Sequence, residues 1–272
     1  MTKSKTTMAS QADKHILYQQ SVQDVASDIE FVKKIFDEKR GRAPQSLRED
    51  FCGTMNAACG WVKDEDFHQA IAIDIDKNVL NWGKENNVSQ LSESQQKRLT
   101  IIQDDVLSVK TDPVDTVIAL NFSYWIFEQR EKMRTYFERI RETLVDDGIL
   151  FLDAFSGYDA YKELEERREL DGFTYVWDQA SYDPITGVMQ CYIHFEFADE
   201  SKIDKAFSYK WRLWTFPELQ EIVMEAGFSK VTVYLEQMDD DSEEDYNGNG
   251  QFEPATSAEA HAGLIAYLVC EK

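Results

Sequence analysis

Hydrophobic positions along the chain follow two different periods. The first periodic segment has apolar residues at helical spacing: Val22, Val25, Ile29, Val32 and Phe36. This spacing predicts an amphipathic helix that ends near Gly41 and Pro44. After it, short apolar runs of strand length alternate with stretches of helical period. Because strands that alternate with helices usually pair in parallel, the pattern predicts an α/β fold, with a mostly parallel sheet flanked by helices and joined by right-handed crossovers.

The apolar runs and the turn residues between them place the elements of this alternation. Strands are expected at 46–51, 69–75, 99–105, 114–121 and 149–155, and helices at about 55–63, 77–87 and 125–145. Gly148 is expected to end the last of these helices. Further along, residues 217–228 have proline in a first helical turn and predict one more helix. Two last strands are expected at 230–237 and 263–272.

Between residues 173 and 214 the period changes to that of strands. Three β-rich runs, two of them around the turn DPITG, predict an antiparallel β insert that caps the main sheet. The polar residues 1–14 are expected to be a disordered tail, and residues 238–260, which are acidic and rich in Gly and Asn, a mobile loop. The prediction is therefore a single domain over residues 15–272 that carries the insert 173–214 before its last helix and strands.

The composition is that of a globular protein with a strongly negative charge. Hydrophobic residues make up 43% of the 272 residues, which is enough for a sizeable core, and the formal net charge is -22. Since such a charge repels phosphate backbones, nucleic acid is not expected as a partner. No apolar run approaches the roughly 20 residues of a membrane helix, and the opening residues lack the apolar centre of a secretory signal. We therefore expect no membrane partner and a cytoplasmic location.

The cysteines and the acidic loop give no sign of a metal site. Four cysteines occur without CxxC or His spacing: Cys52, Cys59, Cys191 and Cys270. This scatter predicts reduced thiols and no zinc site. The stretch DYNGNGQFEPAT, from Asp245, matches the first half of a calcium loop, but Thr256 stands where the bidentate acid belongs. No metal is therefore expected.

The stretch SLREDFCGTMN, residues 46–56, carries the most informative chemistry. A ligand at the carboxyl ends of a parallel sheet needs close backbone, a helix amino terminus and polar groups of suitable charge from the first strand and turn. Gly53 permits the close approach, and Thr54 can start the helix. The dinucleotide fingerprint GxGxxG is absent from this stretch. Glu49 and Asp50 would repel a pyrophosphate and attract a ligand with an ammonium and a sulfonium group, which indicates a cationic cofactor.

This stretch resembles the first motif of the class I S-adenosylmethionine-dependent methyltransferases, which commonly ends in the turn DxGCGTG. The match lies at four positions: Glu49, Cys52, Gly53 and Thr54. Phe51 and Met55 stand where the family has glycines. The REDFCGT version looks like a branch of this superfamily, and the resemblance extends over about residues 15 to 272. It implies the Rossmann-like fold of that class, S-adenosyl-L-methionine as cofactor and methyl transfer as activity.

Polar residues at later strand ends agree with this resemblance. Asp74 ends the second strand about 20 residues after Gly53, where an acid commonly reaches a ribose hydroxyl pair. The resemblance implies that Asp74 binds the ribose and that Asp105 and Val106 bind the adenine. It also implies that Asn121 faces the methionine portion. Any single acid is explained as well by a helix cap or a turn, so it is the agreement of four strand ends that favours a site. The residues expected to bind the cofactor are Tyr18, Glu49, Phe51, Cys52, Gly53, Thr54, Asp74, Ile75, Asp104, Asp105, Val106 and Asn121.

Residues near the fourth strand end are candidates for contact with a methyl acceptor. The sequence NFSYW follows that strand at the carboxyl edge of the sheet, where ligands of open α/β sheets collect. The residues expected to contact the substrate are Ser123, Tyr124, Trp125, Asp153 and Trp177. Tyr124 and His194 are the catalytic candidates, since each can take a proton, and Asp153 is the alternative. For Tyr124 and His194 the competing interpretation is a structural role in packing.

The expected function is S-adenosylmethionine-dependent methyl transfer to a nitrogen or oxygen of a small molecule. Displacement at a sulfonium mainly needs the nucleophile, methyl and sulfur to be held collinear and dry, and a negative pocket favours amine acceptors. Two alternatives stay open. One is another use of the same cofactor, by aminopropyl transfer or by carboxymethyl-cofactor synthesis, in which Arg48 or Arg212 would hold an extra carboxylate. The other is a non-catalytic module that binds the cofactor and a protein partner.

Overall fold

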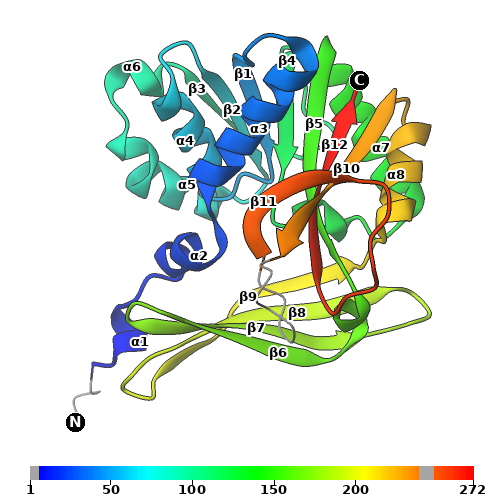
Figure 1. Ribbon diagram of the computed structural model, residues 1–272. Helices are drawn as coiled ribbons and strands as arrows, with labels where there is room; N and C mark the ends of the chain where they lie inside the picture. The colour runs from blue at the N-terminus through cyan, green and yellow to red at the C-terminus, as the bar shows by residue number, and fades with distance from the viewer. Residues whose placement is uncertain (1–5, 239–247) are drawn as a thin grey trace. The chain divides into compact units, whose positions relative to one another are not determined.

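The computed structural model describes residues 6–238 and 248–272 of the chain. Internal contacts divide the chain into two compact units (Figure 1). The larger unit contains Asp24–Gly157 and Trp214–Lys272, and the smaller unit contains the chain up to Gln23 together with Tyr158–Leu213. Each unit is thus built from two separate parts of the sequence.

One eight-stranded sheet, in the order β11-β10-β12-β5-β4-β1-β2-β3, forms the centre of the larger unit. Its strands are β1 (Ser46–Asp50), β2 (Gln69–Asp74), β3 (Leu99–Gln103), β4 (Val114–Ala119), β5 (Leu144–Ser156), β10 (Lys230–Met238), β11 (Gly248–Ala255) and β12 (Leu264–Glu271). The first five are parallel to one another, whereas β12 is antiparallel to both β5 and β10, and β11 to β10. This confirms the predicted α/β fold with a mostly parallel sheet.

Helices cover both faces of this sheet. They are α3 (Val25–Arg40), α4 (Asn56–Asp64), α5 (Lys77–Asn86), α6 (Glu93–Gln96), α7 (Arg130–Thr143) and α8 (Phe216–Glu225), with 3-10 turns η1 (Val88–Gln90) and η2 (Ser123–Ile126). Successive residues of β1 point to opposite faces: Glu49 accepts a hydrogen bond from the Ala58 amide of α4, and Asp50 accepts one from the Tyr136 hydroxyl of α7. Helices α3 and α4 therefore lie over one face, and α7 and α8 over the other (Figure 1).

Helix α3 corresponds to the first helix predicted from the sequence. It ends as predicted at Gly41, which takes the left-handed conformation with φ of 66°. Its start differs from the prediction, because the Asp24 side chain accepts a hydrogen bond from the Ser27 amide and caps the helix there. Val22 consequently belongs to the preceding helix.

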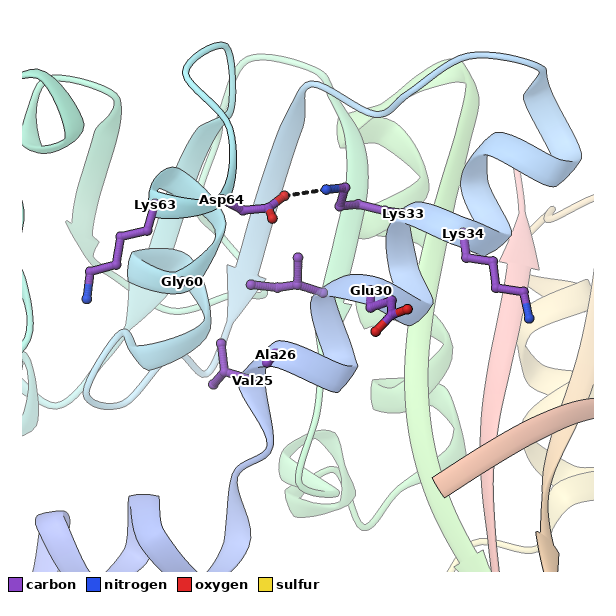
Figure 2. A pocket seen from close by; sticks show the side chains of 9 residues that line it. Val25, Ala26, Glu30, Lys33, Lys34, Gly60, Lys63 and Asp64 are labelled. Atoms are coloured by element: carbon purple, nitrogen blue, oxygen red, sulfur yellow. Dashed lines mark hydrogen bonds and ion pairs between the residues drawn. The ribbon is translucent and has the colours of Figure 1, made fainter. Parts of the chain in front are cut away.

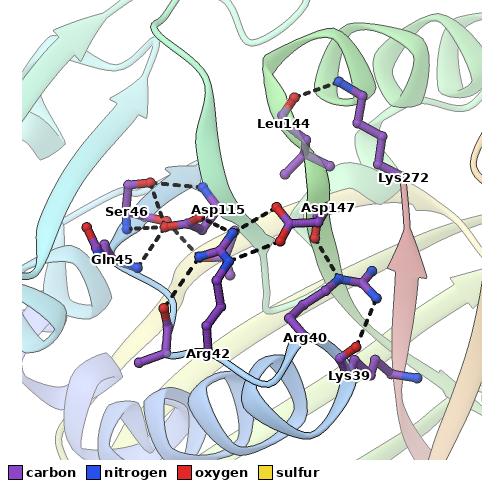
Figure 3. Close-up of polar contacts among 11 residues, drawn as sticks. Lys39, Arg40, Arg42, Gln45, Ser46, Asp115, Leu144, Asp147 and Lys272 are labelled. Carbon is purple, nitrogen blue, oxygen red and sulfur yellow. Dashed lines mark hydrogen bonds and ion pairs between the residues drawn. The ribbon is translucent and has the colours of Figure 1, made fainter.

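An ion network joins the segment after α3 to the amino-terminal ends of the strands (Figure 3). The carboxylate of Asp115, at the start of β4, accepts from Arg42 Nη2 at 2.7 Å and from the amides of Gln45 and Ser46 at 2.7 and 3.0 Å. Arg42 Nη2 also lies 2.8 Å from the Asp147 carboxylate. These bonds fix the start of β1 against β4.

The smaller unit is a four-stranded antiparallel sheet with short helices. In sheet order the strands are β6 (Leu164–Leu170), β7 (Phe173–Tyr182), β8 (Val188–Glu196) and β9 (Lys202–Arg212), and the helical segments are α1 (Met8–Gln11), α2 (Lys14–Val22) and η3 (Tyr158–Tyr161). Alternate residues of β8 are buried, and Ile193 and Phe195 form an apolar cluster with Leu17 of α2. The antiparallel insert is thus confirmed, and the unit extends beyond the predicted range 173–214.

Two segments of regular structure differ from the prediction. Strand β6, LEERREL, was not expected, because most of its side chains are charged and exposed. It is an edge strand, where charged side chains commonly prevent further pairing. Gly148 does not end a helix: α7 stops at Thr143 and β5 already begins at Leu144. A Cβ on Gly148 would lie 2.8 Å from the Leu144 Cβ, so this glycine permits a close contact inside the strand.

The predicted tail and the predicted acidic loop both contain regular structure. Thr7 and Ser10 form a capping box, which satisfies the first amides of α1 and makes these polar residues helical. In the loop 238–260, β11 pairs with β10 and satisfies the backbone groups along that side of the strand. Residues 239–247, which include Asp245 of the calcium-like stretch, lie outside the described residues.

Candidate cofactor site

The carboxyl ends of β1 and β4 form the switch point of the large sheet. From β1 the chain proceeds to β2 and β3 on one side, and it then returns to β4 and β5 on the other. Ligands of open α/β sheets bind at such a point, because the loops after the two strands separate there. The turn after β1 is the REDFCGT motif, and the turn after β4 is NFSYW.

The backbone of the first turn is left-handed at three of five positions. Phe51, Gly53 and Met55 have φ values of 55°, 49° and 61°. For the two residues with side chains this conformation costs about 1 kcal/mol or more each, so the surroundings must hold it. The Cys52 amide donates to the Ile73 carbonyl at 2.9 Å and the Gly53 amide to Asp74 Oδ2 at 2.8 Å. Fixed, strained backbone of this kind is frequent at ligand sites.

Helix α5 supports the same turn from its other side. A Cβ on Gly83 would lie 2.5 Å from the Thr54 carbonyl oxygen, so only glycine allows this approach. Asn87 Nδ2 donates to that oxygen at 2.8 Å. Gly83 and Asn87 were not predicted as site residues. The available signal was a glycine inside the helical run NWGKEN, which often marks close packing.

Asp74 connects the first turn to the start of α5. Its Oδ2 accepts from the Gly53 amide and its Oδ1 from the Asp76 amide, both at 2.8 Å. Burial raises the pKa of this carboxyl, and the two amides oppose the shift. Each carboxylate oxygen has a second lone pair, so Asp74 can still accept from the hydroxyls of a ligand. Ile75, the next residue, is 68% exposed beside it.

Glu49 is a buried acid at the amino terminus of α4. Its Oε2 accepts from the Ala58 amide at 2.8 Å. Burial raises the pKa of Glu49 to about 8, with further increases from Asp74, Asp28 and Asp50. The cation of β1, Arg48, is already bound to Asp50 at 2.6 Å on the opposite face. A positively charged ligand would therefore relieve the repulsion among these acids, which fits an ammonium or a sulfonium.

Asp28, in the first turn of α3, belongs to the same group of acids. It accepts a hydrogen bond from the Tyr267 hydroxyl of β12. Burial raises its pKa to about 6. Asp28 was not predicted as a site residue, although it stands between Val25 and Val32 on the apolar stripe of the helix, where an acid is unusual.

The acids after β3 lie on the surface. Asp104 Oδ1 accepts from the Asp105 amide at 2.8 Å, and Asp105 Oδ1 accepts from the Leu107 amide at 2.9 Å. Both side chains are exposed, whereas Val106 is buried. The Asp104 amide donates to the Asp74 carbonyl at 3.2 Å, so this turn adjoins the end of β2. The structure thus brings the predicted ribose and adenine residues together along one sheet edge.

The loop after β4 carries the residues predicted to face the methyl group and the acceptor. Asn121 and Phe122 are both left-handed, with φ of 57° and 55°. Ser123 Oγ donates to the Leu120 carbonyl at 2.8 Å. The Asp153 carboxylate on β5 accepts from the amides of Asn121 and Phe122. Asp153 therefore contacts the predicted loop directly.

Tyr124 and Trp125 are packed into the core. Both are 0% exposed. The Tyr124 hydroxyl donates to the Asp153 carbonyl oxygen at 2.7 Å, and burial raises the pKa of Tyr124 well above its usual value. The prediction that these residues touch an acceptor required an exposed position at the sheet edge. Their packing instead favours the structural interpretation, because a buried phenol already bonded to the backbone is poorly suited to relay a proton.

Tyr18, Trp177 and His194, also predicted as site residues, belong to the smaller unit. Tyr18 packs on Phe207, with ring centroids 4.9 Å apart. Trp177 pairs with Ile193 across β7 and β8, which places it on the apolar face of the sheet. His194 follows Ile193 on β8, so its side chain points to the opposite face of the sheet. Trp177 and His194 therefore cannot serve one and the same site on this sheet.

Each of these two residues has close neighbours on its own face. Trp177 lies 6.2 Å from Tyr209 and 6.0 Å from Trp211 between ring centroids. His194 lies between two carboxylates, with Nε2 3.3 Å from Asp178 and Nδ1 2.8 Å from Asp204. The first set is a largely buried aromatic cluster, and the second is a charged cluster.

A surface hollow between α3 and α4 is lined by none of the predicted site residues (Figure 2). Its apolar wall includes Val25 and Gly60, and Lys33 pairs with Asp64 across it at 2.5 Å. Within the described part of the chain, no group of three His, Cys, Asp or Glu side chains is arranged to hold a metal ion. The four cysteines are free and buried. No helix among residues 6–238 and 248–272 is long and apolar enough to cross a membrane.

Comparison with solved structures identifies the fold. A S-adenosylmethionine-dependent methyltransferase from Clostridium acetobutylicum superposes with a TM-score of 0.67 at 16% identity, over 94% of this chain and 96% of its own. A sugar N-methyltransferase from Streptoalloteichus gives 0.63 at 16% identity, over 100% and 98%. An amino pentose methyltransferase from Micromonospora echinaspora, solved with bound cofactor, gives 0.63 at 12% identity, over 93% and 95%. No family model and no curated protein sequence matches the chain.

The chain therefore has the fold of the class I S-adenosylmethionine-dependent methyltransferases. The mixed sheet, the four-stranded antiparallel sheet and the antiparallel C-terminal strands are all shared with this class. The similar structures also include a glycopeptide N-methyltransferase solved with S-adenosylmethionine. At identities of this size the likeness is one of fold.

Proposed function

We propose that this protein binds S-adenosylmethionine at the carboxyl ends of β1 and β4 and transfers its methyl group to an amine of a small molecule. The observation that carries the proposal is the group of acids Glu49, Asp74 and Asp28, whose pKa values are all raised in the ligand-free protein. A cofactor that bears an ammonium and a sulfonium supplies the positive charge that this group needs.

The residues around the switch point have distinct roles in this proposal. Asp74 accepts from the ribose hydroxyls through its remaining lone pairs. Asp105 and the Val106 amide pair with the adenine, beside exposed Ile75. The left-handed turn at Phe51–Met55 lets the backbone approach the cofactor, and Glu49 below it balances the cofactor charge. Asn121 faces the methionine portion.

When bound, the cofactor supplies an electrophilic methyl on sulfur, and the protein has to hold the acceptor in line with it and exclude water. An amine acceptor fits this site because it reacts in its neutral form and leaves a cation. A net charge of -22 attracts cations and stabilises that product charge. Similar folds in a sugar N-methyltransferase and a glycopeptide N-methyltransferase support a nitrogen acceptor on a small molecule.

Carboxymethyl-cofactor synthesis is less well supported. That reaction needs a cation for the additional carboxylate, and Arg48 was one of two candidates. Arg48 is fully buried, and its guanidinium donates hydrogen bonds of 2.6 and 3.2 Å to the Asp50 carboxylate. It is therefore already paired with an acid of the same strand. The acceptor experiment described next distinguishes a non-catalytic role from methyl transfer.

Purified protein is incubated with methyl-labelled S-adenosylmethionine and a panel of amines, amino sugars, hydroxyl compounds and carboxylates. The proposal expects label in an amine or amino sugar and production of S-adenosylhomocysteine. Binding of the cofactor without transfer to any acceptor class would favour a non-catalytic module. If label enters only oxygen acceptors, the cofactor assignment stands and the amine assignment is wrong.

A further inference from the structure

The loop after β4 adopts an energetically unfavourable backbone conformation. Asn121 and Phe122 are consecutive residues with φ of 57° and 55°. Neither is glycine, so the left-handed region is sterically unfavourable for Phe122 and less so for Asn121, whose short polar side chain tolerates it better. Two such residues in succession persist only if specific contacts hold them. The contacts must therefore come from a neighbouring element.

Asp153 of β5 supplies these contacts. Leu152 pairs with Ala119, the last residue of β4, so Asp153 stands where β4 ends and the loop begins. Its Oδ2 accepts from the Asn121 amide at 2.6 Å and its Oδ1 from the Phe122 amide at 2.9 Å. One carboxylate thus accepts hydrogen bonds from two successive amides, and such bonds are strong when the acceptor is ionised.

The same residue holds the loop a second time. The Asp153 carbonyl oxygen accepts from the Tyr124 hydroxyl at 2.7 Å, so the start and the end of the segment 121–124 are both attached to one position of β5. The groups that face Asp153 from other elements are Asp28 of α3, Tyr267 of β12 and Tyr124 of η2. None of these is a cation, so the two amides are the principal stabilisers of the charged carboxylate. Burial raises the pKa of Asp153 to about 7, and the amides oppose that shift.

We propose that Asp153 is a positioning residue of the cofactor site, whose carboxylate fixes the left-handed backbone of Asn121 and Phe122 and so places Asn121 against the methionine portion. This inference rests on the proposed function. In this proposal Asp153 acts on the cofactor through the loop, because its two carboxylate oxygens hold the amides of Asn121 and Phe122; a role as a base is one of the outcomes that the test distinguishes. Asp153→Asn tests it, since a carboxamide can accept from one amide but turns a donor toward the other.

The experiment compares the parent protein, Asp153→Asn and the control Asp146→Asn, which makes the same chemical change at an exposed position of the same strand. Calorimetry at pH 8 measures affinity for S-adenosylhomocysteine, and NMR hydrogen exchange measures protection of the Asn121 and Phe122 amides. Asp153→Asn is expected to weaken affinity by about tenfold or more and to reduce protection of both amides by a similar factor. Asp146→Asn is expected to change affinity by less than about threefold.

Parent-like affinity in a folded Asp153→Asn variant overturns the inference, and so does lost methyl transfer with unchanged affinity, which would make Asp153 a base. If the Asp153→Asn variant does not fold, hydrogen exchange in the parent protein tests the inference instead. Protection of the Asn121 and Phe122 amides must be lower at pH 6 than at pH 8, relative to the Asn78 amide, which Asp76 caps at 2.8 Å. Equal ratios overturn the inference. A parent that binds no S-adenosylhomocysteine refutes the proposed function, while the exchange data still decide whether Asp153 fixes the loop.

Discussion

Single carboxyl groups give the candidate site its chemistry. Asp74 and Glu49 were both expected in the site from their places in the sequence. The structure adds that the Asp74 carboxylate accepts a hydrogen bond from the Gly53 amide of the first turn. It also shows that Glu49 accepts one from the Ala58 amide at the amino terminus of α4. For Asp28 the only sequence signal was its place on the apolar stripe of α3, because its role depends on β12, which is distant in the chain and brings Tyr267 to it.

Replacing Asp74 tests the ribose assignment. Asp74→Ala is expected to weaken S-adenosylhomocysteine binding by about 1 to 3 kcal/mol, because it removes charge-assisted bonds to two hydroxyls. Asp74→Asn separates this effect from the turn, since an amide oxygen can still accept from Gly53. Asp146→Ala, which removes the same charge from an exposed position, is the control and should bind like the parent. Unchanged affinity in Asp74→Ala, measured by calorimetry, would remove Asp74 from the site.

Glu49 should lose a proton when the cofactor binds. With a pKa raised to about 8, most of this carboxyl is protonated at pH 7, and a nearby cation lowers that pKa. Calorimetry in buffers of different ionisation enthalpy is expected to show release of about 0.5 to 1 proton at pH 7, and clearly less in Glu49→Gln. Equal proton release in the parent and the variant would show that Glu49 does not respond to the ligand.

At the scale of elements, strands with apolar runs were predictable and charged ones were not. β1, β2, β4 and the second half of β5 followed from apolar runs whose side chains are mostly buried, and β3 followed from apolar residues that are partly buried. β7 to β9 of the insert followed from their β-rich runs. β6 and β11 were missed, since one is a charged edge strand and the other pairs along β10 with few buried side chains. The aromatic residues Tyr124 and Trp125 lie in η2, shortly after β4. Their burial was not predictable, because it depends on packing between η2 and β5.

The aromatic face of the smaller unit is where the predicted substrate role of Trp177 can be tested. Its ring lies among those of Tyr209 and Trp211. Trp177→Ala is expected to raise the KM for the acceptor about tenfold with cofactor affinity unchanged, because an aromatic contact contributes about 1 kcal/mol or more. Tyr192→Ala removes a large ring from the other face of the same sheet and should leave KM near the parent value. Similar KM effects from both variants would point to general loss of stability.

For the whole molecule, the raised pKa values predict that the ligand-free protein is less stable at higher pH. Asp28, Asp153 and Glu49 have pKa values near 6, 7 and 8 in the folded state, above the usual values near 4 in the unfolded chain. The folded state therefore binds more protons between pH 5 and 8, and its free energy of unfolding falls as the pH rises through this range.

Urea unfolding at pH 5.5 and pH 8 measures this dependence. We expect a decrease of at least about 1 kcal/mol at pH 8, discounted from the full shifts because Asp28 and Asp153 are only half-buried. Glu49→Gln should reduce the difference. The comparison is made in 0.5 M salt, so that repulsion within a chain of net charge -22 is screened. A free energy of unfolding that rises with pH over this interval would contradict the raised pKa values of these carboxyls, which have no cation beside them in the described part of the chain.

The most direct test of the central claim is calorimetric titration of the purified protein with S-adenosylhomocysteine at pH 7.5, with NAD as a comparison ligand. The acids at the switch point predict one site per chain with a Kd in the micromolar range, about -7 to -8 kcal/mol, and no measurable binding of NAD, whose pyrophosphate these acids repel. Absence of binding by S-adenosylhomocysteine, or binding of NAD in its place, would contradict the account.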